Sequence, residues 1–254
     1  MNENFGIKNE KEIIKTINGK FLDELPEHFR TPIYAMYRYH HPGKKVEAKK
    51  VSSWFGCKSD IEIWLYGHYM NISIKCGFSP AIHQERMDWF LEFLHDLGIS
   101  NETLDVIRFY HYYDGTLDGS GVKTMRLDDF KMKHKEIIAK ANEELNQEHI
   151  IKAVIYRCAI KGRKSTLQEI NYLYYGTAEK GIFINKNDLM KYCPTINVRE
   201  ETAIHIGPLV YVAKYHRQVT CDDKVVQYAQ LCWPHIEEDV YKIHNMIRNA
   251  KPEN

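Results

Sequence analysis

The run SDIEIWLYGHYMNISIKCG, in the first third of the chain, constrains the fold most. Apolar residues alternate with polar ones on both sides of the residues YGHY; these apolar positions are Ile61, Ile63 and Leu65, then Ile72 and Ile74. A period of two places alternate side chains on opposite faces of a β-strand. We therefore predict a β-hairpin with one apolar face and one polar face.

The polar face of this hairpin carries charges that the packing of two strands does not require. Asp60 opens the first strand and shares its face with Glu62, whereas Ser73 and Lys75 share one face of the second. Hydrolysis of a phosphodiester needs an activated water and neutralisation of developing charge, which carboxylate-bound Mg²⁺ and a nearby lysine supply. The alternative is an exposed ion pair between Asp60 and Lys75 with little energetic consequence.

These residues resemble the PD-(D/E)XK nuclease superfamily, whose core is a helix, a strand with an aspartate, a strand ending in (D/E)XK and a second helix. The matching residues are Asp60 and the SIK of 73–75, with Ser73 where the family usually has an acid. Several restriction endonucleases of this superfamily have S-X-K and take the missing glutamate from the following helix. The resemblance therefore implies Mg²⁺ held by Asp60 and Glu85, with Lys75 positioning the attacking water and Ser73 hydrogen-bonding a ligand or water.

Other acids remain alternatives to Glu85 as the second metal ligand. Glu62 shares the face of Asp60, and Glu92 lies farther along the helix that we predict over 81–97. In this superfamily the helix before the hairpin often gives a further acid, for which Glu24 is the candidate here.

Seven residues are candidate nucleic-acid contacts. They are His83 and Gln84 at the start of the helix predicted over 81–97, Lys161, Arg163 and Lys164 in YRCAIKGRK, and Lys214 and Arg217 after HIGPL. Each has an ordinary alternative, since a basic cluster is often a solvated face and a strand can simply end in basic residues.

Composition limits the class of protein. A chain of 254 residues with 44% hydrophobic and 27% charged residues is an ordinary globular protein, and its net charge of +1 neither requires nor excludes nucleic acid. The longest apolar runs fall short of the roughly 20 residues of a membrane helix. No signal peptide, disulfide framework or phosphate-binding glycine loop is evident, so we expect a cytoplasmic protein with no membrane contact and no nucleotide cofactor.

The pattern along the chain favours an α/β fold. We expect a restriction-endonuclease-like core, a mixed sheet flanked by helices, in residues 1–105, and a Gly/Asp loop with a connecting helix in 106–150. A C-terminal α+β half in 151–254 would contact DNA. Within these regions we expect helices over 10–25, 81–97, Lys186–Tyr192 and Pro234–Ala250, and loop with at most one strand over 26–45.

The function that these observations favour is Mg²⁺-dependent cleavage of double-stranded DNA, as a restriction or defence endonuclease. A homodimer is expected, because a two-fold protein suits a symmetric DNA site. Two rivals remain: a non-catalytic nucleic-acid-binding or defence-associated interaction protein, and an RNA-directed nuclease whose 17 tyrosines would stack on unpaired bases.

Overall fold

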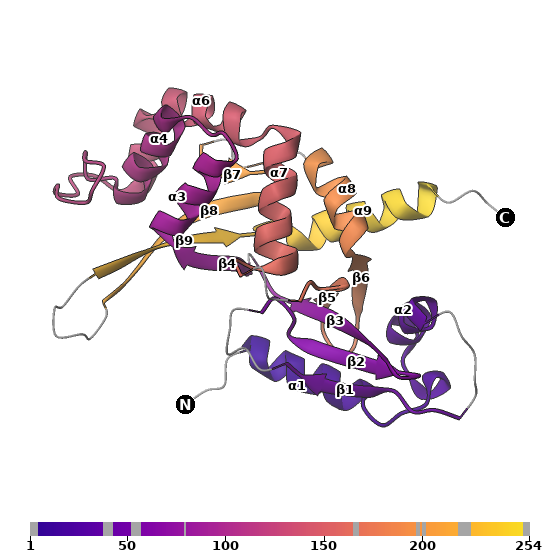
Figure 1. Cartoon of the computed structure of the whole chain (residues 1–254). Helices are drawn as coiled ribbons and strands as arrows, with labels where there is room; N and C mark the ends of the chain where they lie inside the picture. The colour runs from indigo at the N-terminus through magenta and orange to yellow at the C-terminus, as the bar shows by residue number, and fades with distance from the viewer. Residues whose placement is uncertain are drawn as a thin grey trace. The chain divides into compact units, whose positions relative to one another are not determined.

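The computed structural model describes residues 5–37, 43–51, 57–78, 80–164, 168–196, 199, 202–217 and 225–250 (Figure 1). It is a mixed α/β protein with two sheets flanked by helices, which confirms the general fold class. The chain forms two compact units, and each is assembled from separate stretches. Unit 1 comprises Met1–Pro80, Ile155–Tyr192 and His235–Asn254, and unit 2 comprises Ala81–Val154 and Cys193–Pro234.

Unit 1 contains a five-stranded sheet in the order β1-β2-β3-β5-β6. Its strands are β1 (Glu47–Lys50), β2 (Ile61–Leu65), β3 (His68–Lys75), β5 (Tyr172–Gly176) and β6 (Gly181–Asn185). Neighbouring strands are antiparallel except β3 and β5, which are parallel. Parallel neighbours require a long crossover connection, and here the residues between them include the first stretch of unit 2.

The predicted hairpin is confirmed as β2 and β3. Ile61 pairs with Ile72 and Leu65 pairs with His68, so Tyr66 and Gly67 form the turn. Both turn residues have positive φ angles, 54° and 79°, as a tight two-residue connection between twisted strands requires.

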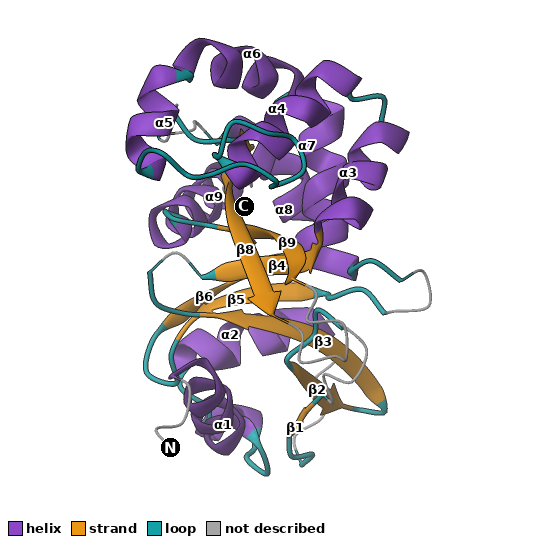
Figure 2. Ribbon diagram, turned by 90° about the vertical axis from the view of Figure 1, so that its left-hand side faces the viewer, coloured by secondary structure: helices purple, strands orange, loops and turns teal. Residues whose placement is uncertain are grey.

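A buried apolar cluster of unit 1 lies on one face of this sheet. Figure 2 shows α1 (Phe5–Ile17) and α2 (Glu27–Tyr37) on one side of the strands. The buried cluster joins apolar residues of both helices to Ile61, Ile72 and Ile74 of the hairpin. Two more helices, α8 (Lys186–Tyr192) and α9 (Ile236–Ala250), contact β6.

The stretch 26–45 differs from its prediction, because much of it is the helix α2 and not loop. Phe29, Ile33 and Met36 recur at helical spacing and are buried against the sheet. This burial outweighs the cost of Pro32 inside the helix, which removes one hydrogen bond.

Unit 2 contains a four-stranded antiparallel sheet in the order β4-β9-β8-β7. Its strands are β4 (Ala81–Arg86), β7 (His205–Ile206), β8 (Leu209–Arg217) and β9 (Val225–Cys232). Its helices are α3 (Met87–Asp96), α4 (Asn101–Tyr112), α5 (Leu127–Lys133), α6 (Lys135–Leu145) and α7 (Glu148–Ile155), the last residue of which belongs to unit 1. A π-helical turn over Tyr156–Lys161 follows α7.

In the described part of the chain no helix is long and apolar enough to cross a membrane.

The helix predicted over 81–97 begins six residues late. Residues 81–86 form β4, which pairs with β9 so that Glu85 lies opposite Ala229. The apolar stripe of the helix starts only at Met87 and continues through Phe90, Leu91 and Leu94. The prediction of helix over 81–86 was wrong because backbone pairing with a strand far along the chain decides the structure there.

Candidate active site

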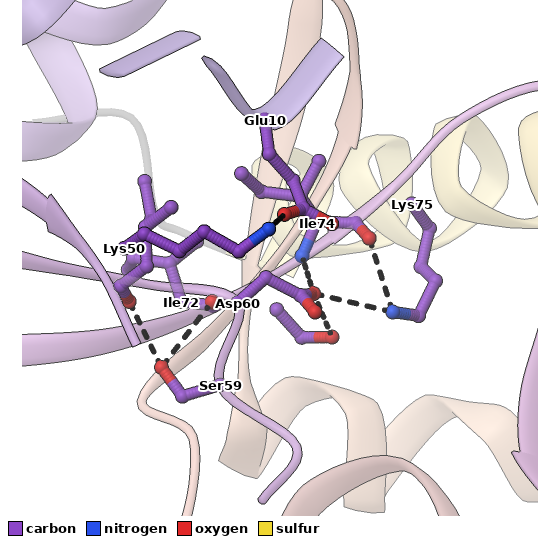
Figure 3. A network of polar contacts seen from close by, with 9 residues as sticks. Glu10, Lys50, Ser59, Asp60, Ile72, Ile74 and Lys75 are labelled. Atoms are coloured by element: carbon purple, nitrogen blue, oxygen red, sulfur yellow. Dashed lines mark hydrogen bonds and ion pairs between the residues drawn. The ribbon is translucent and has the colours of Figure 1, made fainter. Parts of the chain in front are cut away.

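Asp60, Ser73 and Lys75 meet where β2 begins and β3 ends. Figure 3 shows the contact between Asp60 and Lys75. The Oδ2 atom of Asp60 accepts hydrogen bonds from the backbone N–H of Ile74 at 2.6 Å, from Ser73 Oγ at 3.1 Å and from Lys75 Nζ at 3.3 Å. These contacts follow from the register, because pairing of Ile61 with Ile72 places Asp60 opposite Ser73. Of the predicted catalytic residues, these three are therefore brought together.

The two charged groups of this site remain accessible to a ligand. The side chain of Asp60 is 25% exposed and that of Lys75 is 17% exposed, whereas Ser73 is buried. The Lys75 ammonium donates to Asp60 and to the carbonyl of Ile74 at 3.0 Å, which leaves one of its three N–H donors without a partner among the described residues. Among the same residues, no hydrogen bond reaches Oδ1 of Asp60.

Glu10 is a neighbour of this site that the sequence did not indicate. It lies on α1 and forms an ion pair with Lys50 at 2.9 Å. Burial raises the pKa of the Cys76 thiol; hydrogen bonding by Asn9 and the Lys75 ammonium oppose the shift, and the Glu10 and Asp60 carboxylates reinforce it. Both carboxylates therefore act electrostatically on the residue that follows Lys75, and Figure 3 shows Glu10 and Asp60 in the same polar network.

Glu24, the acid suggested from the preceding helix, has a structural contact instead. Its Oε2 accepts a hydrogen bond from the backbone N–H of Phe21 at 2.8 Å, at the start of a short 3₁₀ turn. No pattern in the sequence distinguishes Glu10 from the other acids of α1, because its proximity to β3 results from how the helix packs on the sheet.

Glu62 has neighbours of its own on the polar face of β2. Its Oε2 accepts a hydrogen bond from Trp64 Nε1 at 3.0 Å and forms an ion pair with Lys49 at 3.2 Å. These contacts hold the Glu62 carboxylate against side chains of β1 and β2.

Glu85, His83 and Gln84 lie on β4 in unit 2, whereas Asp60 and Lys75 lie in unit 1. The expected position of Glu85 in the first turns of a helix is therefore wrong. Glu85 Oε1 is 2.9 Å from His83 Nε2, and both side chains are buried. Gln84 is exposed, as alternation along a strand requires.

The predicted basic contacts fall in both units. In unit 1, Lys161 ends the π-helical turn and lies 3.9 Å from Glu169, while Arg163 and Lys164 are exposed in the segment that follows. In unit 2, Lys214 is exposed on β8, and the backbone of Arg217 closes that strand by pairing with Val225.

The donor set at Asp60 fits Mg²⁺ but not a cation that requires a full protein cage. Within the described residues, no group of three or more His, Cys, Asp or Glu side chains could hold a metal ion. Mg²⁺ is usually bound by one or two carboxylates, with waters and substrate phosphates completing its octahedron. Asp60, whose Oδ1 has no hydrogen bond among the described residues, is an acid of this kind, and so is Glu10, which is paired with Lys50.

Comparisons of the chain with protein-family models, with curated proteins and with solved structures find no significant match. The class defined by the structure is therefore a mixed α/β protein with a polar Asp–Ser–Lys site at one end of a β-hairpin. The chemistry of that site is the basis on which a function can be proposed.

Proposed function

We propose that the protein is a Mg²⁺-dependent endonuclease with a restriction-endonuclease-like core in unit 1, and that it hydrolyses DNA phosphodiesters. The observation that carries this proposal is the contact of Asp60, Ser73 and Lys75 at the ends of β2 and β3. The resemblance to PD-(D/E)XK nucleases supports the proposal through the aspartate before β2 and the lysine that ends β3, although β4 and not a helix follows β3.

Asp60 would be the principal metal ligand, with Glu10 as the second carboxylate. Bound Mg²⁺ would supply charge neutralisation on the phosphate and a lower pKa for the attacking water. Ser73 and the Ile74 N–H fix one oxygen of Asp60, which leaves Oδ1 for the cation. Ser73 would therefore position the Asp60 carboxylate, which is a role that a serine can fill where the family usually has an acid.

Lys75 would act in the chemical step. Its remaining N–H donor can hold a water or a phosphate oxygen next to the Asp60 carboxylate. A positive charge held there opposes the negative charge that develops on the phosphate in the transition state. The contribution of such a group is typically a hundredfold or more in rate, as for other acid–base catalysts.

A non-catalytic nucleic-acid-binding protein is the second candidate, because Asp60 and Lys75 already form an ion pair with each other. A fold can keep such a pair after its catalytic role is lost. Metal-dependent cleavage distinguishes the two functions.

The test is incubation of the full-length protein with plasmid and phage DNA, in Mg²⁺ or in EDTA, beside Lys75→Ala. The matched control is Lys242→Ala, an exposed lysine of unit 1. We expect Mg²⁺-dependent fragments from the wild type and the control, and cleavage reduced about a hundredfold or more in Lys75→Ala with DNA binding retained. Equal cleavage by both variants, or no cleavage with any divalent cation, would reject the nuclease proposal.

Cleavage of both strands at a symmetric site would favour a homodimer. Light scattering of the protein with and without a cleaved duplex gives the oligomeric state. Single-stranded DNA and RNA in the same cleavage panel separate a DNA endonuclease from the RNA-directed alternative.

A further inference from the structure

A polar cavity lies on the sheet face that carries Lys75. Its volume is about 390 Å³, and it is lined by Tyr69, Asn71, Lys161, Gln168, Glu169 and Asn171, all of which belong to unit 1. Asn71, Ser73 and Lys75 alternate along β3, so their side chains share the face opposite Ile72 and Ile74. The cavity and the candidate active site therefore lie along one strand.

Two backbone groups fix the orientation of the amides in this cavity. The N–H of Asn71 donates to the side chain of Asn171 at 2.8 Å, which must therefore present its oxygen. The carbonyl of Glu169 accepts from the side chain of Asn71 at 3.1 Å, which must present its nitrogen. That same nitrogen donates to Gln168 Oε1 at 3.2 Å, so Gln168 presents its oxygen in turn.

The consequence is a defined set of donors and acceptors without partners in the described part of the chain. Asn171 and Gln168 each retain a side-chain NH₂ group and one lone pair, and Asn71 retains its Oδ1. A side-chain amide with both a donor and an acceptor available can pair in two places with the N6 and N7 atoms of adenine.

Tyr69 supplies an aromatic wall to this cavity. Its ring is stacked on Trp64 with centroids 4.9 Å apart, and the Lys49 ammonium lies 4.5 Å from the Trp64 ring centroid. The tyrosine is held by this stack and is still 38% exposed. An aromatic ring of this kind binds the face of any unpaired base.

Lys161 supplies a cation at the same place. It lies 3.9 Å from Glu169, too far for a hydrogen bond, whereas Lys186 and Tyr156 each bond Glu169 at 2.6 Å. Those two hydrogen bonds lower the pKa of Glu169, which stays ionised and engaged on both oxygens. Lys161 therefore forms only a long ion pair with Glu169, without a hydrogen bond to it, and its N–H donors can bind a phosphate.

We propose that this cavity binds one unpaired nucleobase of the nucleic acid, stacked on Tyr69 and hydrogen-bonded by Gln168 and Asn171, with adenine bound best. Lys161 contacts a neighbouring phosphate. A base from a single strand, or one flipped out of a duplex, fits this description, whereas a paired base does not. The proposal rests on the proposed function in one respect, namely that the strand bound here is the one cleaved at Lys75.

The test measures binding apart from cleavage, by fluorescence anisotropy of the full-length protein in EDTA. The probes are labelled 12-mers of dA, dT and rA, a 12-mer of abasic sites and the dA·dT duplex. We expect dA or rA to bind most tightly and the abasic strand at least about tenfold more weakly, because it offers no base to stack. The comparison of dA with rA identifies the sugar that is preferred.

Variants then locate the binding in the cavity. Tyr69→Ala should weaken binding of dA by about tenfold, whereas Tyr69→Phe should retain it because the ring is kept. Gln168→Ala should reduce the preference of dA over dT. The matched control is Tyr241→Ala, which removes a similarly exposed tyrosine of unit 1 outside the cavity.

Three results would each overturn the cavity proposal. They are equal binding of dA by Tyr69→Ala and the wild type, equal binding of the dA and abasic strands, and no binding of any probe. Binding that depends on Tyr69, without cleavage in any metal, would keep the cavity proposal and reject the nuclease. If Mg²⁺-dependent cleavage requires Lys75, and Tyr69→Ala changes neither the binding of dA nor the rate of cleavage, the nuclease proposal stands and the cavity proposal is rejected.

Discussion

Two carboxylates predicted to hold one metal ion lie in contrasting environments. Asp60, in unit 1, is 25% exposed and has an oxygen with no hydrogen bond in the described structure. The Glu85 side chain, in unit 2, is 4% exposed and is bonded to a buried histidine. An acid that water reaches can exchange its partners for a ligand, whereas a buried pair is held by the cost of separating its members. The contrast is the reason for proposing a role in cleavage for Asp60 and for expecting a role in stability for Glu85.

The largest effect expected from this contrast is on cleavage by Asp60→Ala. Removing the proposed metal ligand should reduce the rate on the order of a thousandfold, as for other groups that stabilise transition-state charge. Initial rates of plasmid cleavage over a range of Mg²⁺ concentrations measure it. Asp23→Ala, at an exposed acid of unit 1, serves as the control, and an unchanged rate in Asp60→Ala would contradict the assignment.

Glu85→Ala should act on stability. It removes the 2.9 Å contact between Glu85 and the buried His83, and loss of a buried hydrogen bond typically costs about 1–3 kcal/mol in unfolding free energy. Urea denaturation followed by circular dichroism measures the loss. Glu92→Ala is the control, because Glu92 is an exposed acid on α3 in the same unit. A stable Glu85→Ala variant that has lost cleavage would instead restore Glu85 as a catalytic candidate.

A third expectation concerns pH and another buried histidine of unit 2. Burial lowers the pKa of His205 to about 4, from an ordinary value of 6.5. His205 therefore takes up a proton at a higher pH in the unfolded chain than in the folded chain. Its contribution to the free energy of unfolding is fully present above pH 6.5 and is lost as the pH falls toward 4. The loss should reach about 3 kcal/mol for this residue alone.

Urea midpoints at several pH values between 4 and 7 test this expectation. His205→Gln should flatten the dependence, since glutamine does not titrate and can still donate to Asn146. Parallel curves for the variant and the wild type would show that other groups cause the acid sensitivity.

The smallest effect is expected for Glu10→Gln, which tests the second ligand of the proposed metal site. Loss of a second carboxylate should raise the Mg²⁺ concentration needed for half-maximal cleavage by about tenfold, because fewer charges bind the ion. Glu12→Gln, at an exposed residue two positions along α1, is the control. If Glu10→Gln and Glu12→Gln have the same Mg²⁺ requirement, Glu10 serves only its ion pair with Lys50.

The features that were predictable from the sequence are local ones. The hairpin could be predicted because its alternating apolar residues and its tight turn lie within a few residues of each other. The helix at Lys186–Tyr192 has the predicted bounds for the same reason. Contact between Asp60 and Lys75 followed from the hairpin register, since strands joined by a short turn have little freedom to slip.

The features that could not be predicted from the sequence depend on contacts between residues far apart in the chain. Residues 81–86 carry no apolar stripe, and their pairing with β9, more than a hundred residues away, makes them a strand. The position of Glu10 depends on how α1 packs. The assembly of each unit from separate stretches also rests on such pairings, whereas the sequence divides most simply into consecutive parts.

The parallel pairing of β3 with β5 has a consequence for how the protein is made. Ile72 pairs with Tyr172, so β3 must wait for a hundred further residues to leave the ribosome before its second edge is covered. During that interval it presents unpaired N–H and carbonyl groups beside an apolar face, which is a template for aggregation. Contacts between such distant residues also slow folding, because the long loop must close first. A newly synthesised chain is therefore most prone to aggregate while the strand that carries Lys75 still has an unpaired edge.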